Sequence, residues 1–188
     1  PGGMQAAVTA AARGHAVTLY ERAARLGGVV PLAARVPSRA EFAELTRSLE
    51  GAVRRAGVCV RTGVSVTGSD LQSFDAVVLA TGARPVRPSW ACSDRVVDVR
   101  QVLSGRVEPF GSVLVFDELG FHEGTSVAEL LAARGCAVEI ATPGMIVGQD
   151  LGVTLDLELW TIAAEERGIV CTPDVTVASA EPAGDRVR

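Results

Sequence analysis

The sequence contains no lysine, so all 18 of its basic residues are arginines. Any mechanism that needs a lysine amine within this chain is therefore excluded. Aromatic residues make up only 4% of the 188 residues, against 48% hydrophobic residues in total. Because so few aromatics are present, the core must consist mainly of Ala, Val and Leu. The net charge of −4 argues against a nucleic-acid-binding protein that relies on general electrostatic attraction.

The chain also has no C-x-x-C pair and no group of residues with the spacing of metal ligands. No apolar run is long enough to span a membrane. These observations predict no redox disulfide of that type, no metal site and no membrane partner. Three of the four cysteines lie in short apolar runs, which predicts buried free thiols in a reducing compartment, and hence a cytoplasmic location. The four are Cys59, Cys92, Cys136 and Cys171.

The first 21 residues have the order of features found in the back half of a dinucleotide-binding fingerprint. Pro1-Gly2-Gly3-Met4 opens a helix of small residues over 3–13, which Gly14 stops, and the β-rich run Ala16–Tyr20 then ends at Glu21. The glycines allow the backbone to approach a pyrophosphate, and the helix N-terminus supplies N–H groups and partial positive charge. An acidic side chain at the end of the second strand can accept hydrogen bonds from both ribose hydroxyls. The fingerprint's first strand and first two glycines are absent, so we expect the chain to begin inside a nucleotide site and to be a fragment of a longer polypeptide.

Two further glycine motifs support this interpretation. Glu21 is followed by five residues and then Gly27-Gly28, where paired glycines let a second turn fold closely over a nucleotide. The continuous apolar run Asp75–Ala80 predicts a strand buried on both faces of a parallel sheet, and it leads into the turn Thr81-Gly82. The candidate cofactor-binding residues are Gly2, Gly3, Glu21, Arg22, Gly27, Gly28, Thr81 and Gly82.

Periodicity predicts the remaining elements of the first half. Ser38-Arg39-Ala40-Glu41 has the pattern of a capping box and predicts the start of a helix that ends near Gly57. The strand Val58–Arg61 follows. The apolar face predicted for this helix consists of Phe42, Leu45, Leu49 and Val53.

The second half repeats the alternation of strands and helices after an irregular stretch at 83–95, and Asp98 is expected to cap a short helix through Leu103. The predicted elements are a strand at Ser112–Asp117, a helix at Thr125–Arg134, a strand at Ala137–Thr142, an amphipathic helix at Thr154–Arg167, and short strands at Ile169–Thr172 and Val175–Ala178. The segment 181–185 has the composition of a turn cut off before its partner strand. This pattern predicts an α/β fold of two tandem Rossmann-like, three-layer units at 1–105 and 106–188, both incomplete and the first lacking its first strand.

The second unit lacks the glycines of a nicotinamide-binding fingerprint. Asp117 and Glu118 stand directly after the strand, where a working fingerprint has glycine. Two carboxylates beside a helix N-terminus repel a pyrophosphate, which argues against strong NAD(P)H binding there. The other interpretation of this pair is helix capping and solvation. His122, Glu123 and Glu129 are expected to be ordinary polar residues of the loop and helix, and no catalytic acid or base is predicted.

The chain resembles the C-terminal part of enzymes of the trimethylamine dehydrogenase and 2,4-dienoyl-CoA reductase family, which join an old-yellow-enzyme-like barrel to a glutathione-reductase-like pair of domains. The stretch after Gly28 separates this family from disulfide reductases, which have a redox cysteine pair there. The resemblance covers essentially the whole chain and is carried by Arg13–Glu21, Leu26–Gly28, Ala33–Phe42 and Asp75–Pro85. It implies that this part binds FAD or ADP. It also implies that a TIM barrel outside the chain carries FMN, often with an iron–sulfur cluster, and meets the small-molecule substrate.

The sequence leaves three functions open. The preferred one is the nucleotide-binding part of a flavin-dependent oxidoreductase, because cofactors carry redox chemistry while the protein binds and orients them. The second is a structural or assembly module with a vestigial site that is empty or filled by ADP. The third is a simple NAD(P)H-dependent reductase, which the lack of C-x-x-C and the Asp117-Glu118 pair disfavour. Neither the substrate nor the oligomeric state can be predicted, and a homo-oligomer stays open.

Overall fold

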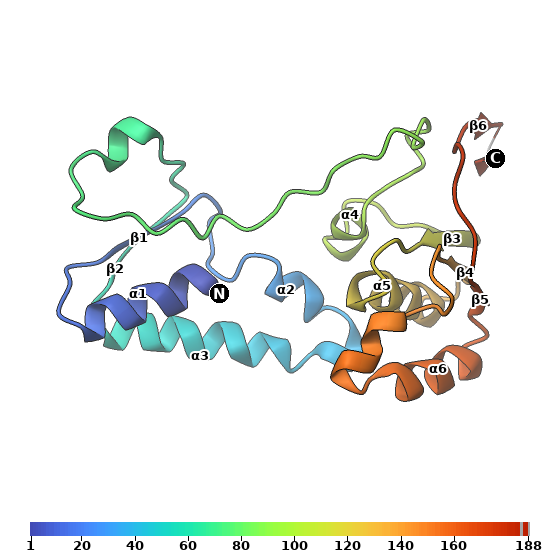
Figure 1. Cartoon of the computed structure of the whole chain (residues 1–188), viewed down its shortest axis with the longest axis horizontal. Helices are drawn as coiled ribbons and strands as arrows, with labels where there is room; N and C mark the ends of the chain where they lie inside the picture. The colour runs from blue at the N-terminus through green and yellow to red at the C-terminus, as the bar shows by residue number, and fades with distance from the viewer. Residues whose placement is uncertain (185, 188) are drawn as a thin grey trace. The chain divides into compact units, whose positions relative to one another are not determined.

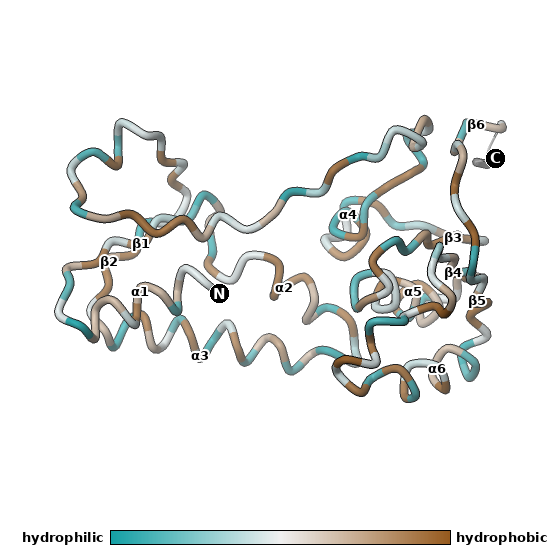
Figure 2. Tube along the Cα trace, viewed as in Figure 1, coloured by the Kyte–Doolittle hydropathy of each residue, from teal (hydrophilic) through white to brown (hydrophobic). Residues whose placement is uncertain are grey.

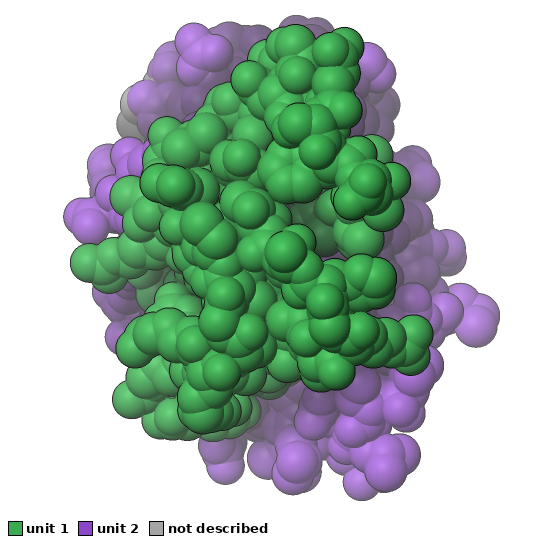
Figure 3. Space-filling model, turned by 90° about the vertical axis from the view of Figure 1, so that its left-hand side faces the viewer, with its two compact units in different colours: residues 1–35, 39–84 green, residues 36–38, 85–188 purple. Residues whose placement is uncertain are grey.

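The computed structural model describes residues 1–184, 186 and 187, which fold into two compact units. The first unit comprises residues 1–35 and 39–84, and the second comprises residues 36–38 and 85–188 (Figure 3). Both units have the predicted α/β composition, with short parallel sheets and packed helices (Figure 1). The stretch 85–105 belongs by its contacts to the second unit, whereas the domain boundary near residue 105 stays a prediction about the whole protein.

The sheet of the first unit has two parallel strands, β1 (Thr18–Glu21) and β2 (Cys59–Thr62), paired in register from Thr18 with Cys59 to Glu21 with Thr62. The helices α1 (Gly2–Ala12) and α3 (Phe42–Arg55) pack on each other, and α1 also contacts β1. The short helix α2 (Val30–Ala33) packs against α3, and two 3-10 helices lie at Pro37–Arg39 and Gly68–Leu71. The buried side chains of this unit's core are Met4, Ala7, Val53 and Val58.

The second unit has three parallel strands in the order β3 (Ser112–Phe116), β4 (Ala137–Ala141) and β5 (Val170–Thr172). The helix α5 (His122–Ala133) contacts β3 and β4, and α4 (Val99–Leu103) packs against α5. The 3-10 helix Gln149–Thr154 contacts α6 (Leu157–Glu166). The strand β6 (Pro182–Ala183) pairs antiparallel with β7 (Arg186–Val187).

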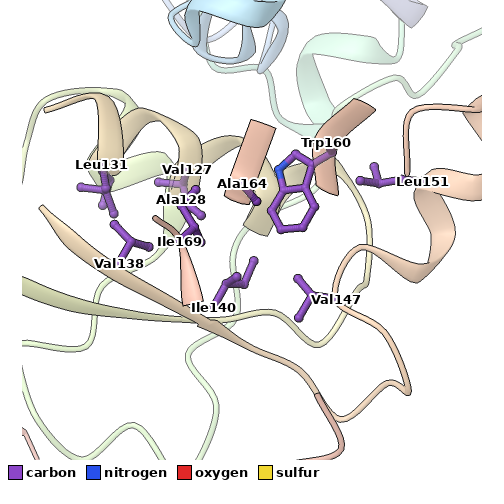
Figure 4. Close-up of a cluster of buried hydrophobic side chains, with 11 residues drawn as sticks. Val127, Ala128, Leu131, Val138, Ile140, Val147, Leu151, Trp160, Ala164 and Ile169 are labelled. Atoms are coloured by element: carbon purple, nitrogen blue, oxygen red, sulfur yellow. The ribbon is translucent and has the colours of Figure 1, made fainter. Parts of the chain in front are cut away.

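The second unit has the larger hydrophobic core. Figure 4 shows its buried side chains, with Ala164 and Leu151 on either side of the Trp160 ring. The indole Nε1 of Trp160 donates a hydrogen bond to the carbonyl oxygen of Thr125, 3.4 Å away, which ties α6 to α5. Both tryptophans of the chain, Trp90 and Trp160, lie in this unit, so tryptophan fluorescence reports on its unfolding.

The strand predicted at Asp75–Ala80 is wrong. This apolar run is the brown stretch in Figure 2, yet the structure assigns it no strand, and Val78 and Leu79 are 72% and 79% exposed. A strand needs a neighbouring backbone to satisfy its N–H and C=O groups, and within the described residues β1 pairs only with β2. The run is therefore extended and without the burial that its composition favours.

The capping box predicted at Ser38–Glu41 is also wrong. α3 begins at Phe42 with Glu41 as its N-cap residue and no side-chain cap hydrogen bond, and Ser38 lies in a 3-10 helix. The true capping boxes are Asp98 with Gln101, as expected for α4, and Thr67 with Asp70. The apolar face predicted for α3 is confirmed in part. Leu49 and Val53 pack in the core of the first unit, whereas Phe42 and Leu45 are 36% and 46% exposed and Thr46 is buried.

Three predictions for the end of the chain need correction. The helix expected at Thr154–Arg167 starts only at Leu157, because Leu155 has a positive φ of 62° that an α-helix cannot continue through. No strand forms at Val175–Ala178, where the N–H of Val175 donates a hydrogen bond of 3.0 Å to the carbonyl oxygen of Thr142. The turn after Glu181 has its partner strand within the chain, because β6 pairs with β7.

The cysteines are free, as predicted, but the expectation that they are buried is wrong for most of them. Cys59, Cys92 and Cys171 are exposed, and Cys136 is half-buried with its Sγ donating to the carbonyl oxygen of Pro109. Cys59 and Cys171 lie in β2 and β5, each of which pairs with only one strand among the described residues. Within the described residues, no helix is long and apolar enough to cross a membrane.

Candidate functional site

The N-terminus of α1 can accept an anion. Its N-cap residue is Pro1, no side chain caps it, and its first turn holds no acidic residue. The first N–H groups of a helix have no partner within the helix, and together with the helix dipole they favour negative charge. A phosphate at this end would therefore find donors that no carboxylate of α1's own first turn competes for.

Two glycine positions shape the space around this helix start. A β-carbon on Gly3 would come 3.4 Å from the Cβ of Ala80 and 3.5 Å from the Cδ1 of Leu19, so the helix packs closely on both segments. Gly28 has a φ of +60°, and a β-carbon there would lie 3.7 Å from the Cδ of Pro1. The two predicted glycine motifs, Gly2-Gly3 and Gly27-Gly28, therefore come together at the start of α1, where Gly28 lies beside Pro1.

Gly27 is the most constrained glycine of the group. Its φ of +114° is one that L side chains rarely adopt, and a β-carbon would come 2.9 Å from both the Cγ of Pro31 and the methyl group of Thr46. Gly27 therefore fixes the turn between β1 and α2 against α3. Nothing in the local sequence predicts that Thr46 contacts Gly27, because the periodicity places its neighbour Leu45 on the buried face of the helix.

Glu21 ends β1, as predicted, and its carboxylate is held in place. Its Oε1 accepts a hydrogen bond of 2.8 Å from the N–H of Ala23. Leu19, two residues earlier on the same strand, lies beside Gly3, so β1 links the carboxylate to the helix start. The next candidate, Arg22, is exposed.

Thr81 and Gly82 are exposed and follow Ala80, which lies against Gly3. Gly82 has a φ of +69°, a turn conformation that favours glycine. The structure thus places Gly28 beside Pro1, and Ala80, the residue before Thr81-Gly82, beside Gly3 at the start of α1. Gly27 packs instead on Pro31 and Thr46, and Glu21 ends β1, which α1 contacts.

The corresponding position of the second unit is closed by its own chain. Asp117 directly follows β3 and is only 4% exposed, so the expectation that it is solvated is wrong, whereas Glu118 is exposed. The Oδ1 of Asp117 accepts hydrogen bonds from the N–H groups of Leu119 and Gly120 at 3.0 and 3.2 Å. Burial raises the pKa of this carboxyl above its ordinary value, the charges of Glu123 and Asp150 act in the same direction, and the two N–H groups oppose them.

Of the polar residues of α5 that the sequence predicts to be ordinary, Glu129 differs from the prediction. His122 is a hydrogen-bonding residue, as predicted, with its Nε2 3.5 Å from the Oγ1 of Thr154. Glu129, by contrast, is buried: its Oε2 accepts from the Oγ of Ser38 at 2.9 Å, and its Oε1 lies 3.6 Å from a guanidinium nitrogen of Arg167. Over the described part of the chain, no three His, Cys, Asp or Glu side chains are grouped so that they could hold a metal ion.

Known proteins that resemble this chain are oxidoreductases. It is 39% identical over 200 residues to N,N-dimethylglycine/sarcosine dehydrogenase of Chromohalobacter salexigens, covering 98% of this chain and 28% of that protein. It is 38% identical over 146 residues to NADH oxidase of Thermoanaerobacter brockii, covering 74% and 22%. The structure of 2-naphthoyl-CoA reductase in complex with 2-naphthoyl-CoA superposes with a TM-score of 0.87 at 24% identity, covering 98% of this chain and 28% of that one. No family model matches.

The parallel α/β units and the glycine-lined helix start therefore define a nucleotide-binding region of an oxidoreductase. The chain belongs to the trimethylamine dehydrogenase and 2,4-dienoyl-CoA reductase family of flavin-dependent, old-yellow-enzyme-related oxidoreductases, as the resemblance predicts. It spans about a quarter of the length of the curated relatives that it matches.

Proposed function

We propose that the first unit binds the ADP moiety of FAD, or ADP itself, within a flavin-dependent oxidoreductase whose substrate reacts at FMN in a barrel outside this chain. The observation that carries this proposal is the uncapped start of α1 at Gly2 and Gly3, with the oriented carboxylate of Glu21 on the adjoining strand. Bound FAD would supply electron transfer, whereas bound ADP would be structural.

Each group at the site has a specific task in holding the nucleotide. The first N–H groups of α1 donate to the pyrophosphate, and the glycines keep side chains away from it. The second oxygen of the Glu21 carboxylate accepts a hydrogen bond from a ribose hydroxyl, while Ala23 keeps the carboxylate in position. Gly28, Thr81 and Gly82 close the site, and the exposed guanidinium of Arg22 lies next to Glu21 in the sequence, where it can approach the nucleotide from solvent.

The domain organisation proposed for the whole protein includes a further strand in the first unit. Within the described residues, β1 pairs only with β2, and the apolar run Asp75–Ala80 is exposed and pairs with no strand. A strand preceding α1 in the longer polypeptide would pair with both and bury Val78 and Leu79. Such a central first strand is what a doubly wound dinucleotide-binding domain has.

The test is to purify the full-length polypeptide that contains this chain and to extract its cofactors by denaturation. Chromatography with mass detection then measures FMN, FAD and ADP per protein molecule. We expect one FAD or one ADP in addition to FMN. FMN alone, with no adenine nucleotide retained, would contradict the proposal.

A further inference from the structure

The turn after β3 is built like a dinucleotide site that already contains its anion. In such sites the first turn of the helix and the loop before it offer N–H groups to a pyrophosphate. Here the loop N–H groups of Leu119 and Gly120 donate to the Oδ1 of Asp117 instead. The donors that a phosphate would need are therefore already used by a carboxylate of the chain itself.

The same carboxylate also fills the space in front of α5. Gly124 is the third residue of α5, and a β-carbon on it would come 2.6 Å from the Cγ and 2.8 Å from the Oδ2 of Asp117. That Oδ2 is buried and has no hydrogen-bond partner among the described residues. Asp117 thus lies directly against the first turn of α5, where Gly124 is required to make room for it.

Backbone hydrogen bonds hold the two ends of the turn Asp117–Gly120. The N–H of Asp150 donates to the carbonyl oxygen of Gly120 at 2.8 Å, and the N–H of Asp117 continues the β3–β4 ladder by donating to Ala141 at 2.8 Å. These two hydrogen bonds fix the main chain on both sides of the turn that carries Asp117.

We propose that Asp117 is the residue that excludes pyridine dinucleotides from the second unit, because its carboxylate occupies the pyrophosphate position and consumes the loop donors. Removing this one side chain opens an anion site at the start of α5. Glu118 is exposed and plays no part in the exclusion.

The experiment titrates NADH into the full-length polypeptide and its variants, and measures the number of NADH molecules bound by equilibrium dialysis. Asp117→Gly is expected to bind one more NADH than the wild type, with an affinity at least about tenfold above any binding at that unit in the wild type. Glu118→Gly is the matched control and should add no NADH. Asp117→Asn keeps the same shape and the same Oδ1 acceptor, so it should add none either.

Two results would overturn the proposal. One is a folded Asp117→Gly variant, shown by unchanged tryptophan fluorescence, that binds no additional NADH. The other is an Asp117→Asn variant that binds NADH as well as Asp117→Gly does, because charge repulsion alone would then explain the exclusion. If Asp117→Gly does not fold, Asp117→Ser takes its place with the same expected gain, and failure of the folded serine variant to bind is equally decisive. The titrations are repeated in the Glu21→Ala background, which weakens any binding of NADH at the first unit. A failure of the proposed first-unit site is then distinguished from a failure of the proposal for Asp117 in the second unit.

Discussion

The hydroxyl of Ser38 donates a 2.9 Å hydrogen bond to the buried carboxylate of Glu129, 91 residues further along the chain. Together with Arg167 on the other oxygen, this contact satisfies a carboxylate that would otherwise be costly to bury. The Ser-x-x-Glu pattern around Ser38 therefore marks a contact distant in sequence and not the start of a helix.

Ser38→Ala is expected to destabilise the second unit by about 1–3 kcal/mol, because the buried Oε2 of Glu129 loses its donor. Denaturant unfolding followed by tryptophan fluorescence measures this, since both tryptophans report on that unit. Ser112→Ala, an exposed serine of β3, is the control and should change stability by less than about 0.5 kcal/mol. Equal stability of the two variants would show that the contact contributes nothing.

Gly27→Ala is expected to destabilise the first unit by at least about 1–3 kcal/mol and to weaken ADP binding, because the new side chain meets Pro31 and Thr46 in a strained conformation. Thermal unfolding by circular dichroism and an ADP titration measure the two effects. Gly68→Ala is the matched control, since a β-carbon there has no neighbour within 4 Å and its φ is not positive. An unchanged melting temperature for Gly27→Ala would be incompatible with the packing of this turn.

Asp117→Asn is expected to change how the stability of the second unit depends on pH. Because the pKa of Asp117 is raised in the folded state, the folded protein holds the proton more tightly than the unfolded chain does. Wild-type stability should therefore fall as the pH rises from the ordinary value of 3.8 through the raised pKa, and this fall should be missing in the variant. Unfolding free energies measured across this range test it, with Glu118→Gln as the control for charge removal. Parallel profiles of wild type and Asp117→Asn would contradict the assigned burial.

Leu79→Asp is expected to have different effects in two polypeptides. In the 188-residue chain Leu79 is 79% exposed, so the change should cost less than about 0.5 kcal/mol. In the full-length polypeptide the proposed neighbouring strand buries Leu79, and a buried unpaired carboxylate should cost several-fold more. Circular dichroism melts of both proteins give the comparison, and Val86→Asp, at an 86% exposed position, is the control. Equal small effects in both would count against the added strand.

Features that depend on neighbouring residues in the sequence are the ones that could be predicted. Asp98 caps α4 because both partners of a capping box lie within four residues of the chain. Glu21 and the glycines are predictable for the same reason, since strand ends and positive φ angles are local properties. Ser38 and Thr46 are not, because their contacts with Glu129 and Gly27 depend on which segments far apart in sequence pack together. The hydrogen-bond partners of Asp117 are local, but its burial is not visible in the local sequence. Asp75–Ala80 was predicted as a strand from composition, but pairing needs a neighbour that the described residues do not supply.

The most direct test of the central claim is the affinity for ADP and for 2′-deoxy-ADP, measured by calorimetry on the full-length polypeptide after removal of its bound nucleotide. Glu21→Ala should weaken ADP binding at least about tenfold, because a charge-assisted hydrogen bond to the ribose is lost. The wild type should prefer ADP over 2′-deoxy-ADP, and Glu21→Ala should lose that preference, while Glu41→Ala, at an exposed carboxylate, behaves like the wild type. Equal ADP affinity of the wild type and Glu21→Ala would contradict the assignment of this site.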